Sequence, residues 1–259
     1  MLRLATSVLL ILAAFCAQAQ PRILWSAGME FGDLREWEYQ FNSDGGQSTA
    51  VLAASEGIPA KSGSWVMKQT FPGVTGGTRT YRFSTLNQVY RTGEPLYYSF
   101  WAYFPEAVQN SGFFNLLQVQ AVNADWQLEP VWILGIHPTN STLKLEWWGR
   151  GQMEGPQAGE HGGKAYEQPV PVPVGQWVFI QFMVTPREDF SGAVKVWLND
   201  AVVFDVQNVR TKFPESYVPS WAISFLIGKD AYGMNLASPN HRHYIDDVTI
   251  SLDPLPYSP

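Results

Sequence analysis

Short alternating or apolar runs, separated by Gly, Pro, Asn and Asp, recur along the chain after residue 19, and no helical period of useful length accompanies them. A period of two places successive side chains on opposite faces of a sheet. Many such runs with regular turn signals predict an all-β chain folded as an antiparallel β-sandwich. The turn signal Asn199-Asp200 marks the clearest hairpin. The predicted strands are Ser64–Phe71, Thr78–Phe83, Leu96–Tyr103, Phe114–Ala121, Val131–Ile136, Thr142–Trp148, Trp177–Thr185, Ala193–Leu198, Ala201–Val206, Trp221–Ile227 and Tyr244–Leu252.

Two longer stretches lack the alternating pattern. Gly149–Pro173 is rich in Gly, Gln and Glu, and Gly228–Arg242 contains Gly, Asn, Ser and Pro. We expect both to be loops, and loops of this length are usually functional or mobile. Strands on both sides of each loop are needed to complete one sandwich, so we expect a single domain over residues 20–259.

The first 19 residues have the organisation of a secretory signal peptide. Arg3 gives a positive start, Val8–Phe15 an apolar core, and Ala17-Gln18-Ala19 a cleavage site. The apolar run is too short to span a bilayer, although a retained anchor is the alternative. We therefore expect secretion to the extracellular space or the periplasm after cleavage near Ala19. Because Cys16 is the only cysteine, the mature chain would contain no disulfide.

The two ends of the mature chain carry acidic segments, Met29–Trp37 and His243–Ser251. A carboxylate close to a core must be paired or bound to a metal. We place Glu30 and Asp33 on a strand that ends in a tight turn at Gly32. The first and last strands are then expected to lie side by side, with a cation between them. Alternation in the last strand predicts one shared face for Tyr244, Asp246, Val248 and Ile250.

Charge and aromatic content limit the partners of the chain. It carries 17 basic and 23 acidic residues, a net charge of −6. This balance disfavours a nucleic-acid binder or a protein that binds anionic membranes. Eleven Trp, eleven Tyr and fifteen Phe are many for a chain with few charges, and aromatic rings both fill sandwich cores and stack on sugar rings. We assign Trp101, Trp177 and Trp197 to the core.

Several segments occur in an order found in one known superfamily. They are Tyr97–Pro105, Phe113–Gln120, Leu143–Trp147, Val174–Phe182, Gly192–Asp200 and Tyr244–Val248. This order resembles the concanavalin A-like jelly roll and, within it, the heparin-lyase-like polysaccharide lyases. The resemblance implies a secreted monomer that cleaves an acidic, uronate-containing extracellular polysaccharide by β-elimination. The alternatives are a non-catalytic carbohydrate-binding sandwich and an interaction domain of the laminin-G type, because the same motifs occur there.

A lyase of this kind needs a base for the C5 proton beside the carboxylate and an acid for the leaving oxygen, commonly His and Tyr. His161 and Tyr166 occur together in the first expected loop, and His241 and His243 precede the last strand, beside Tyr232. The resemblance therefore implies a catalytic set drawn from His161, Tyr166, Tyr232 and His241.

The resemblance also implies a row of side chains across the concave sheet that binds the sugar and neutralises its carboxylate. The candidates are Arg79, Arg82, Asn115, Gln118, Gln120, Trp148, Arg150 and Lys229. Alternation puts Arg79 and Arg82 on opposite faces of their strand, so only one is expected to face the substrate. A glycoside hydrolase would need two facing carboxylates, and Glu146 has no evident partner in the sequence.

The acidic residues near the two ends resemble the structural calcium site of many sugar-binding sandwiches. Glu30, Asp33 and Asp247 would supply the hard oxygen ligands that Ca²⁺ prefers. A loop at Ala60–Ser64 would add backbone carbonyl oxygens. The alternative is a surface salt bridge between these carboxylates and a neighbouring arginine.

Overall fold

The computed structural model describes residues 20–71, 73–81, 93–122, 128–137, 140–147, 165–213, 225–237 and 241–259. Within them the chain forms fifteen strands and one short 3-10 helix, η1 (Ala53–Glu56). No helix in these ranges is long and apolar enough to cross a bilayer. The strands are β1 (Ile23–Ala27), β2 (Tyr39–Ser43), β3 (Gln47–Leu52), β4 (Trp65–Thr70), β5 (Gly76–Tyr81), β6 (Leu96–Tyr103), β7 (Asn110–Val122), β8 (Leu128–Ile136), β9 (Thr142–Trp147), β10 (Ala165–Pro171), β11 (Trp177–Thr185), β12 (Gly192–Leu198), β13 (Ala201–Val209), β14 (Phe225–Leu236) and β15 (Arg242–Ser251).

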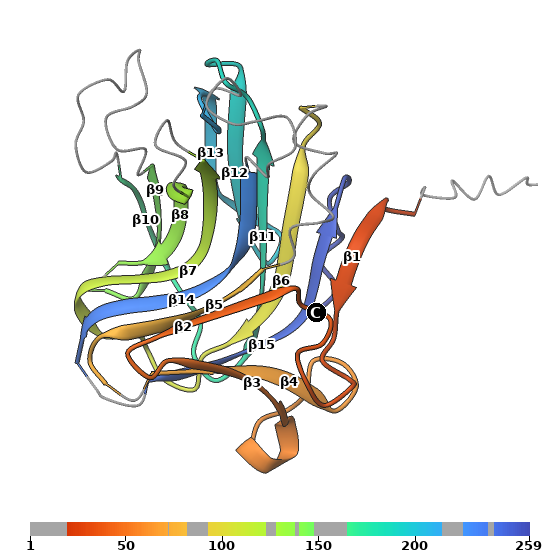
Figure 1. The fold of residues 1–259 in the computed structure, drawn as a ribbon, viewed down its shortest axis with the longest axis vertical. Helices are drawn as coiled ribbons and strands as arrows, with labels where there is room; N and C mark the ends of the chain where they lie inside the picture. Colours follow the sequence, from red (N-terminus) through yellow and green to blue (C-terminus); the bar gives the residue numbers. More distant parts are fainter. Residues whose placement is uncertain are drawn as a thin grey trace, which may run out of the picture.

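The strands form two antiparallel sheets, which confirms the predicted fold class. Sheet A has the order β13-β12-β11-β6-β15-β4-β3, and β1 pairs with β15 beside this path. Sheet B has the order β10-β9-β8-β7-β14-β5-β2. In Figure 1, β7 and β14 run beside each other as long curved strands of sheet B, and the shorter β5 follows on the other side of β14.

Apolar side chains from both sheets pack between them in one continuous cluster. Phe100 and Phe182 enter it from sheet A, and Phe114 and Trp132 enter it from sheet B. All four are almost completely buried, and aromatic burial of this kind is a main source of stability in a sandwich. Because one face of sheet B is packed against sheet A, the alternate side chains of its strands lie on the opposite, outer face.

The prediction that three tryptophans lie in the core holds in part, because Trp101 is buried whereas Trp177 and Trp197 are half-buried, and none of the three enters the cluster between the sheets. Trp101, Trp177 and Trp197 alternate with inward-pointing residues of β6, β11 and β12, so they lie on the outer face of sheet A. Trp101 packs there on Phe179, with ring centres 5.3 Å apart, and on Tyr257 of the C-terminal segment at 5.8 Å. Sequence alternation alone could not show which of the two faces a terminal segment covers.

The first and last strands lie side by side, as predicted, because β1 pairs with β15. The backbone of Asp247 has a φ of +47°, and the pairing of β15 with β6 shifts register at this point. The resulting β-bulge interrupts the alternation, so Val248 packs in the core whereas Asp246 points outward. The predicted common face is therefore wrong for Tyr244, Asp246, Val248 and Ile250.

Two strands lie in stretches that were expected to be loops. β10 contains Pro169 and Pro171, which an edge strand tolerates because one side of its backbone has no ladder partner. β14 continues through Gly228 and Lys229, residue types that are uncommon inside strands. Both additions widen sheet B on either side of β7, and β14 supplies part of the candidate site.

Candidate functional site

A small groove lies on the outer face of sheet B. Its hollow has a volume of about 190 Å³. The neighbours of its lining residues along the strands, such as Thr78 and Ala231, are completely buried on the inner side of the sheet. The lining residues, which define the groove, are Arg79, Phe113, Asn115, Gln118, Pro130, Ile133, Glu146 and Tyr232. Four of these eight were predicted from the sequence: Arg79, Asn115, Gln118 and Tyr232.

Arg79 and Tyr232 lie next to each other in the groove. The guanidinium carbon of Arg79 is 5.7 Å from the centre of the Tyr232 ring and 5.9 Å from that of Phe41. Phe113 stacks on Tyr232, with ring centres 5.5 Å apart. Cation–π contacts and ring stacking restrict both side chains. A positive charge and a phenol are thereby held side by side.

Three carboxamides of β7 continue the polar surface. Gln120 donates a hydrogen bond of 2.9 Å from Nε2 to Oε1 of Gln118, and both are largely buried, as is Asn115. Strict alternation would put Asn115 and Gln118 on opposite faces of the sheet. A register shift between β7 and β8 follows Asn115 and brings both side chains to the groove. The groove therefore contains fixed hydrogen-bond donors and acceptors.

An ion pair lies on the other side of the groove, on β9. Lys144 Nζ is 2.6 Å from Glu146 Oε1, and β8, β7 and β14 separate this pair from Arg79 on β5. Neither residue belongs to the predicted substrate-binding set. A signal was present in the sequence, because both residues alternate with buried leucines in β9. The groove consequently has a basic residue near each of its two sides.

A family model agrees with this architecture. The model described as "Polysaccharide lyase" matches residues 29–228, which is more than half of the chain. The chain belongs to the polysaccharide lyase family. The match runs from before β2 to the beginning of β14 and thus includes most of the groove strands. No protein with a curated description matches the sequence.

Solved lyase structures share the fold of this family member. An endo-β-1,4-glucuronan lyase from the fungus Trichoderma reesei has a TM-score of 0.62 at 19% identity, over 88% of this chain and 95% of that one. A PL-14 alginate lyase from Aplysia kurodai has a TM-score of 0.60 at 12% identity, over 88% and 98%. An alginate lyase from a Chlorella virus has a TM-score of 0.51 at 10% identity, over 83% and 92%. At these identities the likeness shows the jelly-roll sandwich fold.

Tyr166, a predicted catalytic residue, lies behind sheet B. It is in register with Leu145 of β9, which is completely buried. Its ring stacks on the buried ring of Trp132, with centres 6.2 Å apart. This location differs from the expected one, because the side chain packs against the core and does not line the groove.

Lys229, a predicted substrate-binding residue, is completely buried between the sheets. Its Nζ donates a hydrogen bond of 2.8 Å to the carbonyl oxygen of Leu116 and lies 3.4 Å from Nε2 of His243. Its backbone N–H donates to the hydroxyl of Tyr98 at 3.1 Å. Leu116 follows Asn115 at the register shift of β7, so Lys229 supports the strand from behind and does not reach the groove surface.

His241, also predicted to be catalytic, lies in the interior at 4% exposure. Its ring stacks on Phe71 at 5.9 Å and contacts Phe114 edge-on at 4.9 Å between ring centres. Burial, with a smaller effect of the Arg242 charge, lowers the pKa of His241 from 6.5 to about 4. His243, which neighbours Lys229, also has its pKa lowered well below 6.5 by burial. A buried imidazole of this kind is neutral at pH 7 and contributes to packing.

The buried histidine makes stability depend on pH. The unfolded chain binds a proton at His241 near pH 6.5, whereas the folded chain does so only near pH 4. The contribution of His241 to the free energy of unfolding is therefore fully present above pH 6.5 and is lost as the pH falls to 4, and the loss at pH 4 is on the order of 3 kcal/mol. Urea unfolding at several pH values should show this slope, and His241→Phe should reduce it. His137→Gln is the control, because the half-buried His137 follows β8 and lies beside the exposed Glu167. Equal slopes in wild type and His241→Phe would contradict the assignment.

Four predicted residues, Arg82, Trp148, Arg150 and His161, lie outside the described residues. Their roles stay predictions. No histidine in the described part of the chain lines the groove.

Glu30 and Asp247, two predicted calcium ligands, lie close together beside Gly28. A Cβ atom at Gly28 would be 3.7 Å from Oδ1 of Asp247 and 3.8 Å from Cγ of Glu30. Ser62 donates a hydrogen bond of 2.7 Å from its hydroxyl to Asp247. Glu30 lies in a turn after β1, and not on a strand as expected. The carboxylate of Glu30 accepts hydrogen bonds from the backbone N–H groups of Ser64 and Trp65. The two acidic ends therefore both lie beside Gly28, and carboxylate oxygens are ligands of the kind that a hard cation prefers.

Asp33, the third predicted ligand, forms an exposed ion pair with Arg35, and this hydrogen-bonded arginine lowers the pKa of the carboxyl group. For Asp33 the structure therefore agrees with the alternative to a calcium site, a surface salt bridge with a neighbouring arginine. No group of three His, Cys, Asp or Glu side chains in the described ranges is placed to hold a metal. A cation here would depend on two carboxylates together with neutral oxygen atoms.

Proposed function

We propose that this protein is a secreted, monomeric lyase, with residues 1–19 as its signal peptide, that cleaves an acidic, uronate-containing polysaccharide in the groove. The observation that carries the proposal is the placement of Arg79, two carboxamides and Tyr232 around one hollow. A lyase needs a cation and hydrogen-bond donors for the carboxylate and a side chain that transfers a proton. Membership of the polysaccharide lyase family supports the proposal, and the fold occurs in a glucuronan lyase and in alginate lyases.

In the proposed reaction, Arg79 and the carboxamides of Asn115 and Gln118 bind the substrate carboxylate. They stabilise the negative charge that develops when C5 loses its proton. The electron pair of the C5–H bond forms the C4–C5 double bond, the C4–O bond breaks, and the leaving oxygen takes up a proton. The Tyr232 hydroxyl performs one of the two proton transfers. His161 is the proposed second group.

Ultraviolet absorbance during incubation with a panel of uronic-acid polysaccharides tests the proposal, because β-elimination creates an unsaturated, absorbing product. A rise with one polymer identifies both the reaction and the substrate. No rise, together with retention of the protein on one of these polymers, would replace the lyase with the alternative, a non-catalytic carbohydrate-binding sandwich. Sequencing of the N-terminus of the exported protein tests cleavage after Ala19.

We further propose that Glu30 and Asp247 hold a structural Ca²⁺, with the Ser62 hydroxyl and backbone carbonyl oxygens as additional ligands. Removing calcium with EDTA should lower Tm by about 5–10 °C, since calcium at ~100 times its Kd contributes about 2.7 kcal/mol to the folded state. Differential scanning fluorimetry measures the change. Asp247→Asn, which tolerates the positive φ, should abolish the response, and Asp33→Asn should retain it. An EDTA-independent Tm in the wild type would contradict the proposal.

A further inference from the structure

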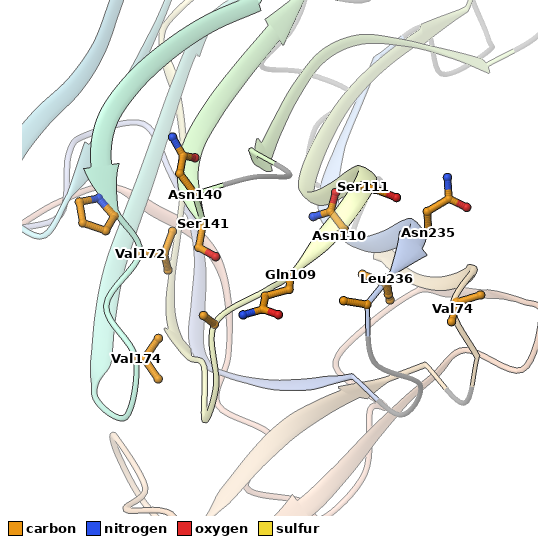
Figure 2. Close-up of a pocket in the computed structure, with 13 residues that line it drawn as sticks. Val74, Gln109, Asn110, Ser111, Asn140, Ser141, Val172, Val174, Asn235 and Leu236 are labelled. Carbon is orange, nitrogen blue, oxygen red and sulfur yellow. The ribbon is translucent and has the colours of Figure 1, made fainter.

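A second and larger hollow lies at one end of the sandwich, and we refer to it as the end cavity. Its volume of about 860 Å³ is within the range of roughly 300–1,000 Å³ that is typical of ligand sites. It shares no lining residue with the groove. Figure 2 shows the valines that follow β10 on one side of the cavity and the end of β14 on the other, with Gln109 and Asn110 between them. The lining residues are Val74, Ala107, Gln109, Asn110, Ser111, Asn140, Ser141, Pro171, Val172, Val174, Asn235, Leu236 and Ala237.

The lining of the end cavity is polar but uncharged. Six of its residues carry a carboxamide or a hydroxyl group, and the others are apolar. The groove, by contrast, contains Arg79 and Glu146. A carboxylate would enter the end cavity without a cationic partner from its lining, which is costly. Neutral hydroxyl groups suit the cavity better, because carboxamides both donate and accept hydrogen bonds.

The walls of the end cavity are tied together by hydrogen bonds. The backbone N–H of Leu236 donates to the carbonyl of Val74 at 2.8 Å, which joins β14 to the turn between β4 and β5. The N–H of Ala237 donates to the carbonyl of Gln109 at 2.9 Å, and the Ser141 hydroxyl donates to a carbonyl of the same loop at 2.7 Å. A ligand would therefore meet a preformed site, which lowers the entropy cost of binding.

Asn110 is the most informative residue of the end cavity. Its side chain is 7% exposed, and both its Oδ1 and its Nδ2 are buried with no hydrogen-bond partner. A separate hollow of about 160 Å³ shares Ala107, Gln109 and Leu236 with the end cavity and is also lined by Glu106 and His241. Buried polar groups are nearly always hydrogen-bonded in native proteins. The unsatisfied carboxamide of Asn110 in the lining of the end cavity indicates a bound group that both donates and accepts.

We propose that the end cavity is a second carbohydrate-binding site, which takes a neutral sugar unit whose adjacent hydroxyl groups pair with the carboxamide of Asn110. The apolar side chains of Val172, Val174 and Leu236 would contact the C–H faces of the ring. Such a site would hold an uncharged part of a glycan independently of cleavage in the groove.

Isothermal titration of the mature protein with cellotetraose and mannotetraose, and with tetraglucuronate for comparison, tests the proposal. We expect saturable binding of a neutral tetrasaccharide that Asn110→Ala weakens by at least about tenfold, the effect of one or two lost hydrogen bonds. Asn235→Gly removes an exposed carboxamide from the cavity and suits the φ of +55° at that position. Asn208→Gly is its matched control, because Asn208 is an exposed residue of β13 with a φ of +58°.

Neutral-sugar binding should persist in the groove variant Tyr232→Phe, so a failure of the lyase proposal is distinguishable from a failure of this one. Absence of binding at about 10 mM of either neutral tetrasaccharide would overturn the proposal. Unchanged affinity in both Asn110→Ala and Asn235→Gly would also overturn it, as would a crystal structure grown with the bound sugar that shows only water at Asn110.

Discussion

Replacing Tyr232 with phenylalanine should lower kcat on an acidic polysaccharide by on the order of 10²–10⁴-fold, with little change in KM. The substitution removes only the hydroxyl that we assign to proton transfer. The ring can keep its stacking on Phe113 and its contact with Arg79, so the binding surface is retained. Initial rates of ultraviolet absorbance change, measured over a range of substrate concentrations, separate kcat from KM.

Tyr166→Phe is the matched control for this experiment. The Tyr166 ring packs on Trp132 and does not line the groove, so we expect no contact between its hydroxyl and a sugar bound there. Its kcat should stay close to that of the wild type. Full activity of Tyr232→Phe would show that the proton-transfer assignment is wrong, and equal losses in both variants would point to a structural effect.

Replacing Arg79 with glutamine should lower kcat/KM by on the order of 10²–10³-fold, because the cation that stabilises the developing charge at the uronate is removed. Arg79→Lys should recover part of this loss, since lysine keeps the charge but not the planar fork that can bind a carboxylate at two points. The ratio of kcat/KM values gives the lost transition-state stabilisation directly.

Arg35→Gln is the control for charge removal. Arg35 is exposed and pairs with Asp33, far along the chain from the groove strands, and exposed ion pairs contribute little to stability. Its kcat/KM should equal that of the wild type. If Arg79→Gln were fully active with an unchanged Tm, neutralisation of the carboxylate would have to come from another residue, and Lys144 on β9 would be the first to examine.

The sequence predicted strands best where one or both faces are buried. Leu96–Tyr103 and Trp177–Thr185 have the same bounds in the structure, because both are central strands of sheet A with a continuous inward face. β2 (Tyr39–Ser43) was missed because it is an edge strand whose side chains are mostly exposed and lack an apolar face. β10 was missed because of its prolines. Edge strands owe their pairing to neighbours far away in the sequence, and local pattern does not contain that information.

The sequence predicted only part of the site, because the orientation of side chains in the groove also depends on how strands pair. Residue types of the groove were found, since Arg79, Gln118 and Tyr232 are polar residues in or near strands. The face of the sheet on which a side chain lies, however, depends on β-bulges, and a β-bulge forms only when strands pair. The extra residue after Asn115 changes the face of everything that follows it in β7. Lys229 shows the opposite case, because a lysine in strand-like sequence gives no sign that it is enclosed between two sheets.

The position of β15 in sheet A has a consequence for how the chain reaches its native state. β15 is the last strand along the chain, yet it lies between β6 and β4 and also pairs with β1. Sheet A therefore cannot be completed before β15 is formed. Until then the strands β13-β12-β11-β6 and the pair β4-β3 have open edges where β15 will pair. Pairing between residues this distant in sequence slows folding, and open edges invite association with other chains. Deleting Arg242–Ser251 would consequently leave two incomplete half-sheets, and not a sandwich that is one strand narrower.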